Sequence, residues 1–238
     1  MHHEPPFILP TLSKWHRNKM LGYAEQVLIT QQQMTTDQGQ NILHHTLQDK
    51  RRHVRMNHYP KGDRIDKTTG AQYFYHCHRE NRKSKEHGHF HCFLRYKHIP
   101  KSIKPTPLSD WKKNFDNPMA HIVAISMNRF GQPIRLFTVN RWVTDEVWYD
   151  GKHVAHFIKR YKMTLNTDPY WQVLDQWVDA MLHLFAPQIA WLHHHRDLVI
   201  AHHQLLKPDV NIYEDETIEE LSHISIDLKD QVNWLLTG

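Results

Sequence analysis

Histidines recur at alternate positions in two neighbouring segments of the chain, and this spacing could build a metal site. His76 and His78 are two residues apart in the first segment, and His87, His89 and His91 repeat the interval in the second. Residues two apart share one face of a β-strand. Imidazole nitrogen is a common ligand of zinc and also suits iron, copper and nickel. The pattern therefore predicts an imidazole face that binds a divalent transition metal, zinc or iron.

The two segments are close enough along the chain to form one β-hairpin. A register that pairs His76 with His89 also pairs His78 with His87, and it brings all the hairpin histidines to one patch. Directly opposed residues of an antiparallel pair have their Cβ atoms about 5 Å apart. We therefore expect His76, His78, His87, His89 and His91 to supply the metal ligands and their supporting groups.

The other face of this hairpin is apolar, and we expect it to pack against helices in the C-terminal part of the chain. Tyr75, Phe90 and Leu94 fall on that face, together with the two cysteines of the chain, Cys77 and Cys92. Buried free thiols behave as small hydrophobic groups. We therefore do not expect either cysteine to act as a nucleophile.

Three further residues are candidates for roles beside the metal. Glu86 precedes the second histidine segment, and a carboxylate ligand from it or from Glu80 would shift the preference towards non-haem iron or manganese. His121 begins a later predicted strand and Arg141 follows the end of the next one. If these strands join the same sheet, both side chains could orient a ligand or clamp an anion. We expect Asp63, in a Pro- and Gly-containing segment, to cap a turn.

Secondary-structure signals divide the chain into helices at its ends and strands in its middle. Alternating apolar residues predict strands over Gln72–His78, His87–Arg95, Ala120–Met127 and Ile134–Asn140. Helical periodicity predicts helices over Ser13–Gln33, Asp37–Gln48, Trp171–Phe185 and Pro187–Leu206. We expect a surface loop at His58–Asp63 and an acidic C-terminal tail that begins at Tyr213.

This order of elements indicates an α+β fold, with an antiparallel sheet and a histidine-rich hairpin flanked by N-terminal and long C-terminal helices. The 238 residues fit one domain. Within the single domain 1–238, residues 1–50 form N-terminal helices, 51–145 the sheet region and 151–238 the C-terminal helical region.

Histidine is abundant throughout the chain, with 23 residues, so some clusters could arise from composition alone. His193, His194 and His195 illustrate this, because they fall in a predicted helix. Successive residues of a helix diverge by about 100° and cannot chelate one ion together. We expect these three side chains at the surface.

Hydropathy, cysteine content and charge limit the cellular compartments and the classes of partner that we expect. No run approaches the roughly 20 apolar residues of a membrane-spanning helix, so we expect no membrane partner. The low cysteine count favours a reducing, cytoplasmic location. Lysine and arginine exceed aspartate and glutamate by 30 to 25, which keeps nucleic acid open as a partner. A small-molecule substrate is the other expected partner, and the sequence does not specify an oligomeric state.

Several segments resemble those of a bacterial family of unknown function, and the similarity runs along most of the chain. They are His58–Asp63, Tyr73–His78, Glu86–Arg95 and Thr138–Thr144. This resemblance implies a shared fold and site but no activity.

Two weaker local resemblances concern the histidine segments themselves. Residues 87–93, His-Gly-His-Phe-His-Cys-Phe, are similar to the motif of histidine-triad nucleotide hydrolases and transferases, apart from Gly88. That likeness implies that His89 would attack an α-phosphate. His76-Cys77-His78 resembles the paired histidines of the cupins, although the expected glutamate spacing is absent.

The favoured hypothesis is a metal-dependent enzyme, either a hydrolase that uses metal-bound water or an oxygenase. The alternatives are a non-catalytic metal-binding or metal-sensing protein, a histidine-triad-like nucleotide hydrolase or transferase, and a basic nucleic-acid-binding module. An open coordination position would favour the enzyme, and a closed site with four protein ligands would favour the binder.

Overall fold

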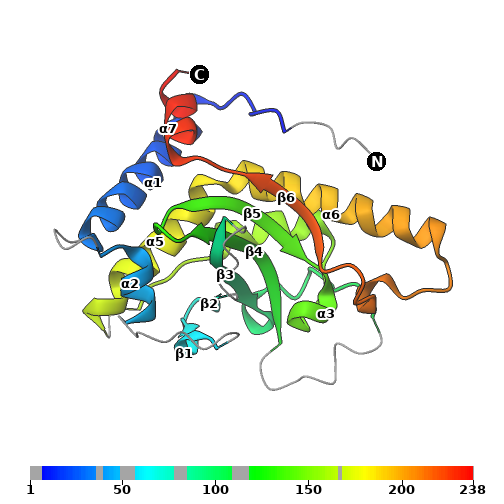
Figure 1. Ribbon diagram of the computed structural model, residues 1–238. Helices are drawn as coiled ribbons and strands as arrows, with labels where there is room; N and C mark the ends of the chain where they lie inside the picture. The colour runs from blue at the N-terminus through cyan, green and yellow to red at the C-terminus, as the bar shows by residue number, and fades with distance from the viewer. Residues whose placement is uncertain are drawn as a thin grey trace.

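A computed structural model describes residues 7–35, 40–48, 57–77, 85–108, 118–165 and 168–237. In these residues the strands form a six-stranded antiparallel sheet whose spatial order follows the chain order (Figure 1). The strands are β1 (Tyr59–Ile65), β2 (Ala71–Cys77), β3 (Glu86–Arg95), β4 (Met119–Asn128), β5 (Pro133–Val139) and β6 (Glu220–Ser225). The helices and the sheet together confirm the predicted α+β class.

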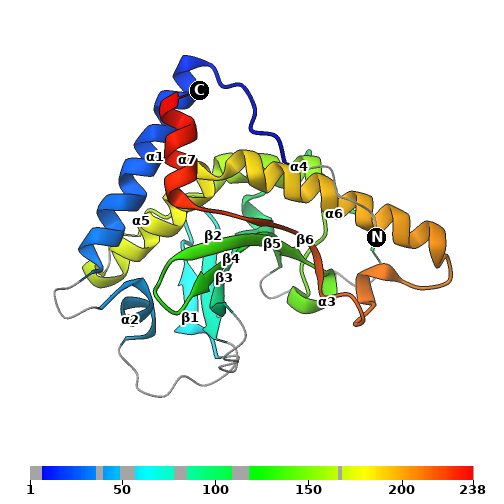
Figure 2. The same cartoon turned by 45° about the horizontal axis from the view of Figure 1, so that its top comes forward.

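The α-helices are α1 (Lys14–Gln33), α2 (Ile42–Leu47), α3 (Arg141–Thr144), α4 (Gly151–Phe157), α5 (Pro169–Leu184), α6 (Ala186–Leu206) and α7 (Leu228–Thr237). The long helices cover one face of the sheet, whereas α3 packs its Val143 against Phe137 on the other face. Figure 2 shows α5 and α6 running along one side of the sheet, with α1 and α7 side by side beyond α5. The short helices α2 and α3 lie near the ends of the strands.

Local signals explain where the long helices begin. Ser13 caps α1 by accepting a hydrogen bond from the main chain of His16. Asp168 caps α5 in the same way through Tyr170, and Pro169 follows in the first turn. Caps of this kind stabilise a helix by roughly 1 kcal/mol because they satisfy an unpaired N–H group.

The core forms between the helices and the apolar face of the predicted hairpin. Phe90 contacts the ring of Trp177 on α5, with 5.5 Å between ring centroids. Tyr73 donates its hydroxyl to Asp175 of the same helix at 2.8 Å. Tyr75, Phe90, Cys92 and Leu94 are all buried within this core, which confirms the expected packing against a C-terminal helix.

Two strands lie where we expected none. The segment around His58–Asp63 begins β1, which pairs with β2 across an irregular register between Tyr59 and Arg64. The expected acidic tail contains β6, which pairs with β5. Proline, glycine and acidic residues weaken the strand signal, and pairing with a neighbouring strand overrides it in both places.

The sheet also sets which face each hairpin histidine occupies. Strands β2 and β3 pair in the expected register, with His76 opposite His89 and Phe74 opposite His91.

Among the described residues, no helix has the length and hydropathy that a bilayer crossing requires.

Candidate metal centre

Three hairpin histidines meet at one point on the sheet face opposite the core. The Nε2 atom of His89 lies 2.6 Å from that of His76 and 3.0 Å from that of His91. All three side chains are buried, and His91 is only 1% exposed. Within the described parts of the chain, this triad is the group whose ligand atoms lie within 4.8 Å of one another. The three imidazoles could therefore hold one metal ion.

Glu86 fixes the tautomer of the central imidazole. Its Oε1 lies 2.9 Å from Nδ1 of His89. Because an ionised carboxylate only accepts, His89 must donate from Nδ1, which leaves the lone pair on Nε2. This arrangement of carboxylate, imidazole and inward-facing Nε2 is typical of histidines that bind metals.

A β-bulge in β3 places Glu86 on this face and corrects the expected position of His87. The pairing of β3 with β4 shifts register between Glu86 and Gly88. Period-two spacing would place His87 beside His89, but the inserted residue reverses the alternation at the start of the strand. Nδ1 of His87 instead lies 2.8 Å from the hydroxyl of Tyr75, whose ring belongs to the apolar core.

Further polar groups hold the Glu86 carboxylate in place. Ser126 donates its hydroxyl to Oε2, and Arg135 approaches the same oxygen at 3.4 Å. Burial raises the pKa of Glu86, but the hydrogen bonds from His89 and Ser126 and the charge of Arg135 oppose it, and the pKa falls to about 2. Glu86 is therefore an anion at neutral pH. Neither Ser126 nor Arg135 stood out in the sequence, because only the register of β4 and β5 brings them here.

His121 supports the third imidazole. Its Nε2 lies 3.0 Å from Nδ1 of His91, which leaves Nε2 of His91 facing the other two histidines. Burial, followed by repulsion from His89, His121 and other histidines, holds the pKa of His91 well below its usual range. Burial and the charge of Arg196 lower the pKa of His121 to about 3. Both rings are therefore neutral at pH 7, as metal ligation requires.

A buried carboxyl group anchors the main chain of His121. Glu146 accepts the N–H group of His121 at 2.8 Å. Its side chain is 1% exposed, and burial raises its pKa to about 7 against the opposing charges of Arg196 and Arg141. The position of His121 thus depends on an acidic group that the sequence did not single out.

The structure does not bring every predicted residue to the triad. Arg141 is buried and forms ion pairs with Glu214 and with Asp145, the latter at 3.2 Å. The ion pair with Glu214 ties α3 to the segment before β6, and the one with Asp145 lies within the end of α3. His78 lies outside the described residues, as do most residues of 50–55 and 79–85, two segments rich in lysine and arginine.

Aromatic rings surround the triad. Phe74 lies 5.3 Å from His91 and 5.9 Å from His76, measured between ring centroids. Phe137 lies 4.9 Å from His89 on the other side. A metal held here would lie in a largely apolar environment, which strengthens its electrostatic effect on a bound group.

The two cysteines are free and buried on the core face, as expected. Burial raises the pKa of Cys77 to about 11 and that of Cys92 further still. A thiol reacts through its thiolate, so neither side chain is prepared for nucleophilic chemistry at neutral pH.

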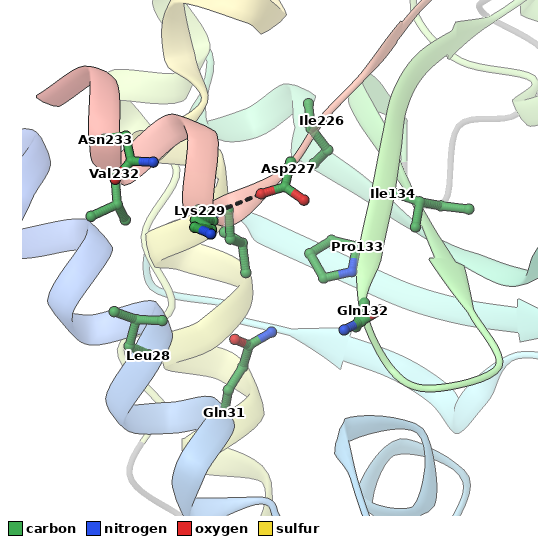
Figure 3. A pocket seen from close by; sticks show the side chains of 11 residues that line it. Leu28, Gln31, Gln132, Pro133, Ile134, Ile226, Asp227, Lys229, Val232 and Asn233 are labelled. Atoms are coloured by element: carbon green, nitrogen blue, oxygen red, sulfur yellow. Dashed lines mark hydrogen bonds between the residues drawn. The ribbon is translucent and has the colours of Figure 1, made fainter.

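A separate cavity of about 510 Å³ lies between α1, α7 and the start of β5 (Figure 3). Leu28, Pro133 and Val232 give it apolar walls, and Gln31 and Asn233 add amide groups. Its carboxylate, Asp227, accepts hydrogen bonds from the main chain of α7 at 2.7 and 3.1 Å. None of its lining residues is a histidine or a cysteine.

Comparisons with known proteins give a family without an activity. A family model described as "Domain of unknown function (DUF6969)" matches residues 21–226, and therefore most of the chain. No curated protein and no solved structure matches. The matched range contains every residue of the triad and its supporting groups.

Proposed function

Since the chain belongs to DUF6969, a family of unknown function, we propose its activity from the metal centre alone. The protein is a metal-dependent enzyme in which His76, His89 and His91 bind a divalent transition metal. Glu86 and His121 orient two of these ligands. The substrate is a small molecule, and the reaction is either hydrolysis or oxygen chemistry.

One observation carries this proposal: the Nε2 atoms of His76 and His91 both lie within hydrogen-bonding distance of Nε2 of His89. Glu86 leaves a single in-plane lone pair on that atom. One lone pair cannot accept two well-aligned hydrogen bonds, whereas a cation can accept one lone pair from each ring. A shared metal ion therefore satisfies all three nitrogens together.

The set of ligands favours zinc or iron. Zinc is bound by three imidazoles in several catalytic sites, and imidazole also suits iron. Glu86 does not act as a further ligand, because its two oxygens already bind His89, Ser126 and Arg135. Its carboxylate instead accepts a hydrogen bond from Nδ1 of the ligand His89 and so orients that imidazole.

The small number of ligands favours an enzyme over a storage or sensing protein. Structural zinc sites are usually closed by four protein ligands, while catalytic sites keep a position for water or substrate. In the described residues the triad contributes three nitrogen atoms. A metal with an open position would activate water at neutral pH or bind an oxygen-containing substrate.

We also propose a reducing, cytoplasmic location for this activity. The proposal is supported by two free thiols that are buried in the core without a disulfide.

Cobalt(II) substitution tests the open position. We expect one cobalt per chain to give a visible spectrum that changes when azide is added, because azide displaces water from an open position. His194→Ala, which alters an exposed residue of α6, should give the same spectrum and response. A cobalt spectrum that does not respond to azide would support a closed site and the non-catalytic binding function.

A further inference from the structure

A histidine and an aspartate at the beginning of β1 form a pair beside the metal centre. Nδ1 of His58 lies 2.8 Å from Oδ1 of Asp63. The His58 side chain is 43% exposed, while that of Asp63 is 14% exposed. Because the carboxylate accepts at Nδ1, the Nε2 atom of His58 is the nitrogen available to another molecule.

Asp63 is held in place on its other side as well. Its Oδ2 accepts a hydrogen bond from Gln72 at 2.7 Å, and Gln72 in turn accepts one from Arg95 at 3.0 Å. Both carboxylate oxygens therefore have defined partners. This chain of contacts links the aspartate to β2 and β3, the two strands that carry the metal ligands.

The backbone at this position is unusual for a strand. Asp63 has a φ angle of +60°, and Gly62 before it has a φ angle of +84°. The pairing of β1 with β2 shifts register across the same residues. Positive φ is disfavoured for residues other than glycine, and such conformations cluster at functional sites. Here the bent strand directs the Asp63 carboxylate back towards His58.

The ring of Phe74 contacts both His58 and two of the proposed metal ligands. The imidazole of His58 stacks on Phe74, with 3.6 Å between centroids and 7° between ring planes. Phe74 contacts the rings of His76 and His91. The exposed imidazole of His58 and two histidines of the buried triad therefore contact a common aromatic ring, that of Phe74.

We propose that His58 is the acid–base residue of the metal centre and that Asp63 is its positioning residue, an inference that rests on the proposed function. With a metal bound at the triad, Nε2 of His58 would take a proton from a substrate or water there and later return it to the leaving group, so that the imidazole would end each cycle unchanged. Asp63 holds the ring through Nδ1 and stabilises the imidazolium formed in between. The same division of roles serves histidine–aspartate pairs in other enzymes.

A purely structural pair would have different properties. If the pair only stabilised the bend in β1, the accessibility of His58 would not change when a ligand binds at the triad. A pair that faces the substrate position must respond to a ligand there. This difference can be measured without knowing the natural substrate.

The test uses full-length cobalt-substituted protein with acetohydroxamate as the probe, since this anion binds open metal positions. Diethyl pyrocarbonate labels accessible imidazole nitrogens, and mass spectrometry reports the labelling of each histidine. We expect acetohydroxamate to suppress labelling of His58 but not that of His194 on α6. In His58→Gln, cobalt content should match the wild type, while acetohydroxamate affinity falls about tenfold, the effect of losing one hydrogen bond to a charged group.

The variant Asp63→Asn separates positioning from contact. It should keep the cobalt content and weaken acetohydroxamate binding less than His58→Gln does, because the amide oxygen still accepts from Nδ1. Equal affinity in wild type and His58→Gln, or labelling of wild-type His58 that ignores the probe, would overturn the acid–base role. A wild-type protein that takes up no cobalt would instead overturn the proposed function, and the cobalt measurement tells these two failures apart.

Discussion

The hairpin histidines and the histidines of α6 have the same chemistry but different geometry. On the hairpin, His76, His89 and His91 direct Nε2 atoms to one point. On α6, consecutive histidines turn away from each other: His193 is buried and its Nε2 lies 2.6 Å from the carbonyl oxygen of Ile122, while His194 is exposed. Histidine content alone therefore does not make a metal site.

The α6 run also corrects the expectation that its histidines lie at the surface. His193 is fully buried and His195 is 4% exposed, with its ring tilted by 42° against that of Trp191 at 3.9 Å between centroids. A helix in contact with a sheet must bury one face, whatever residues occupy it. His193 lies on this buried face and donates a hydrogen bond to the carbonyl oxygen of Ile122 in β4, so it is part of the core.

The largest effect should come from His89→Ala. This variant removes the central ligand, and we expect metal affinity to fall by more than about 100-fold, beyond the range of losses seen for supporting residues. Competition with a chromogenic chelator measures the affinity. His194→Ala is the matched control and should bind as the wild type does. Equal affinities in the two variants would contradict the assignment of the triad.

The converse result is expected for His193→Ala. Loss of a buried imidazole and its hydrogen bond should lower the free energy of unfolding by about 2 kcal/mol, because the carbonyl of Ile122 loses its partner from α6. Metal affinity should not change. Urea denaturation and the chelator assay together give both quantities. A loss of metal without a loss of stability would reverse the roles we assign to the two groups of histidines.

Acid sensitivity should distinguish His121 from an exposed histidine. Its pKa is about 3 in the folded protein, below the ordinary value of about 6.5 in the unfolded chain. Below pH 6.5 the unfolded state binds a proton that the folded state does not, so stability falls as pH falls. The cost is about 1.4 kcal/mol for each pH unit.

His121→Gln removes this titration while keeping an acceptor for His91. In chelator-treated protein, the variant should lose less stability than the wild type between pH 6.5 and 5.5, measured by urea denaturation. The other titrating groups, including Glu146, are present in both proteins. Identical pH dependence in the two proteins would show that His121 is not held neutral.

A smaller effect is expected from Glu86→Gln. The amide oxygen can still accept from His89, but the negative charge behind the ligand is lost. Removing such a group lowers metal affinity about tenfold, and the same chelator assay should detect it. An affinity equal to that of the wild type would mean that Glu86 does not support the metal.

Much of the hairpin could be predicted from sequence because strand alternation is a local property. The period of two, together with the short connection, predicted the pairing of His76 with His89 and the apolar face that includes Phe90. It could not predict the β-bulge that separates His87 from the triad, because a bulge depends on the pairing with β4.

Residues brought in from other strands were harder to find. His121 was singled out because it begins a predicted strand, and the register of β4 places it against His91. Arg141 follows β5 in the same way, but its carboxylate partners on the segment before β6 and at the end of α3 hold it elsewhere. His58 was predicted in a loop and lies directly before β1, but the strand that follows it was missed because proline and glycine weaken the strand signal of Tyr59–Ile65.

Elemental analysis of the tag-free wild-type protein tests the central claim most directly. The protein should be produced in metal-supplemented medium, purified without metal-affinity steps and measured beside His89→Ala. We expect about one equivalent of zinc or iron per chain in the wild type, bound through neutral imidazoles, and little in the variant. A wild-type protein without stoichiometric transition metal, or a variant with the same content, would contradict the account.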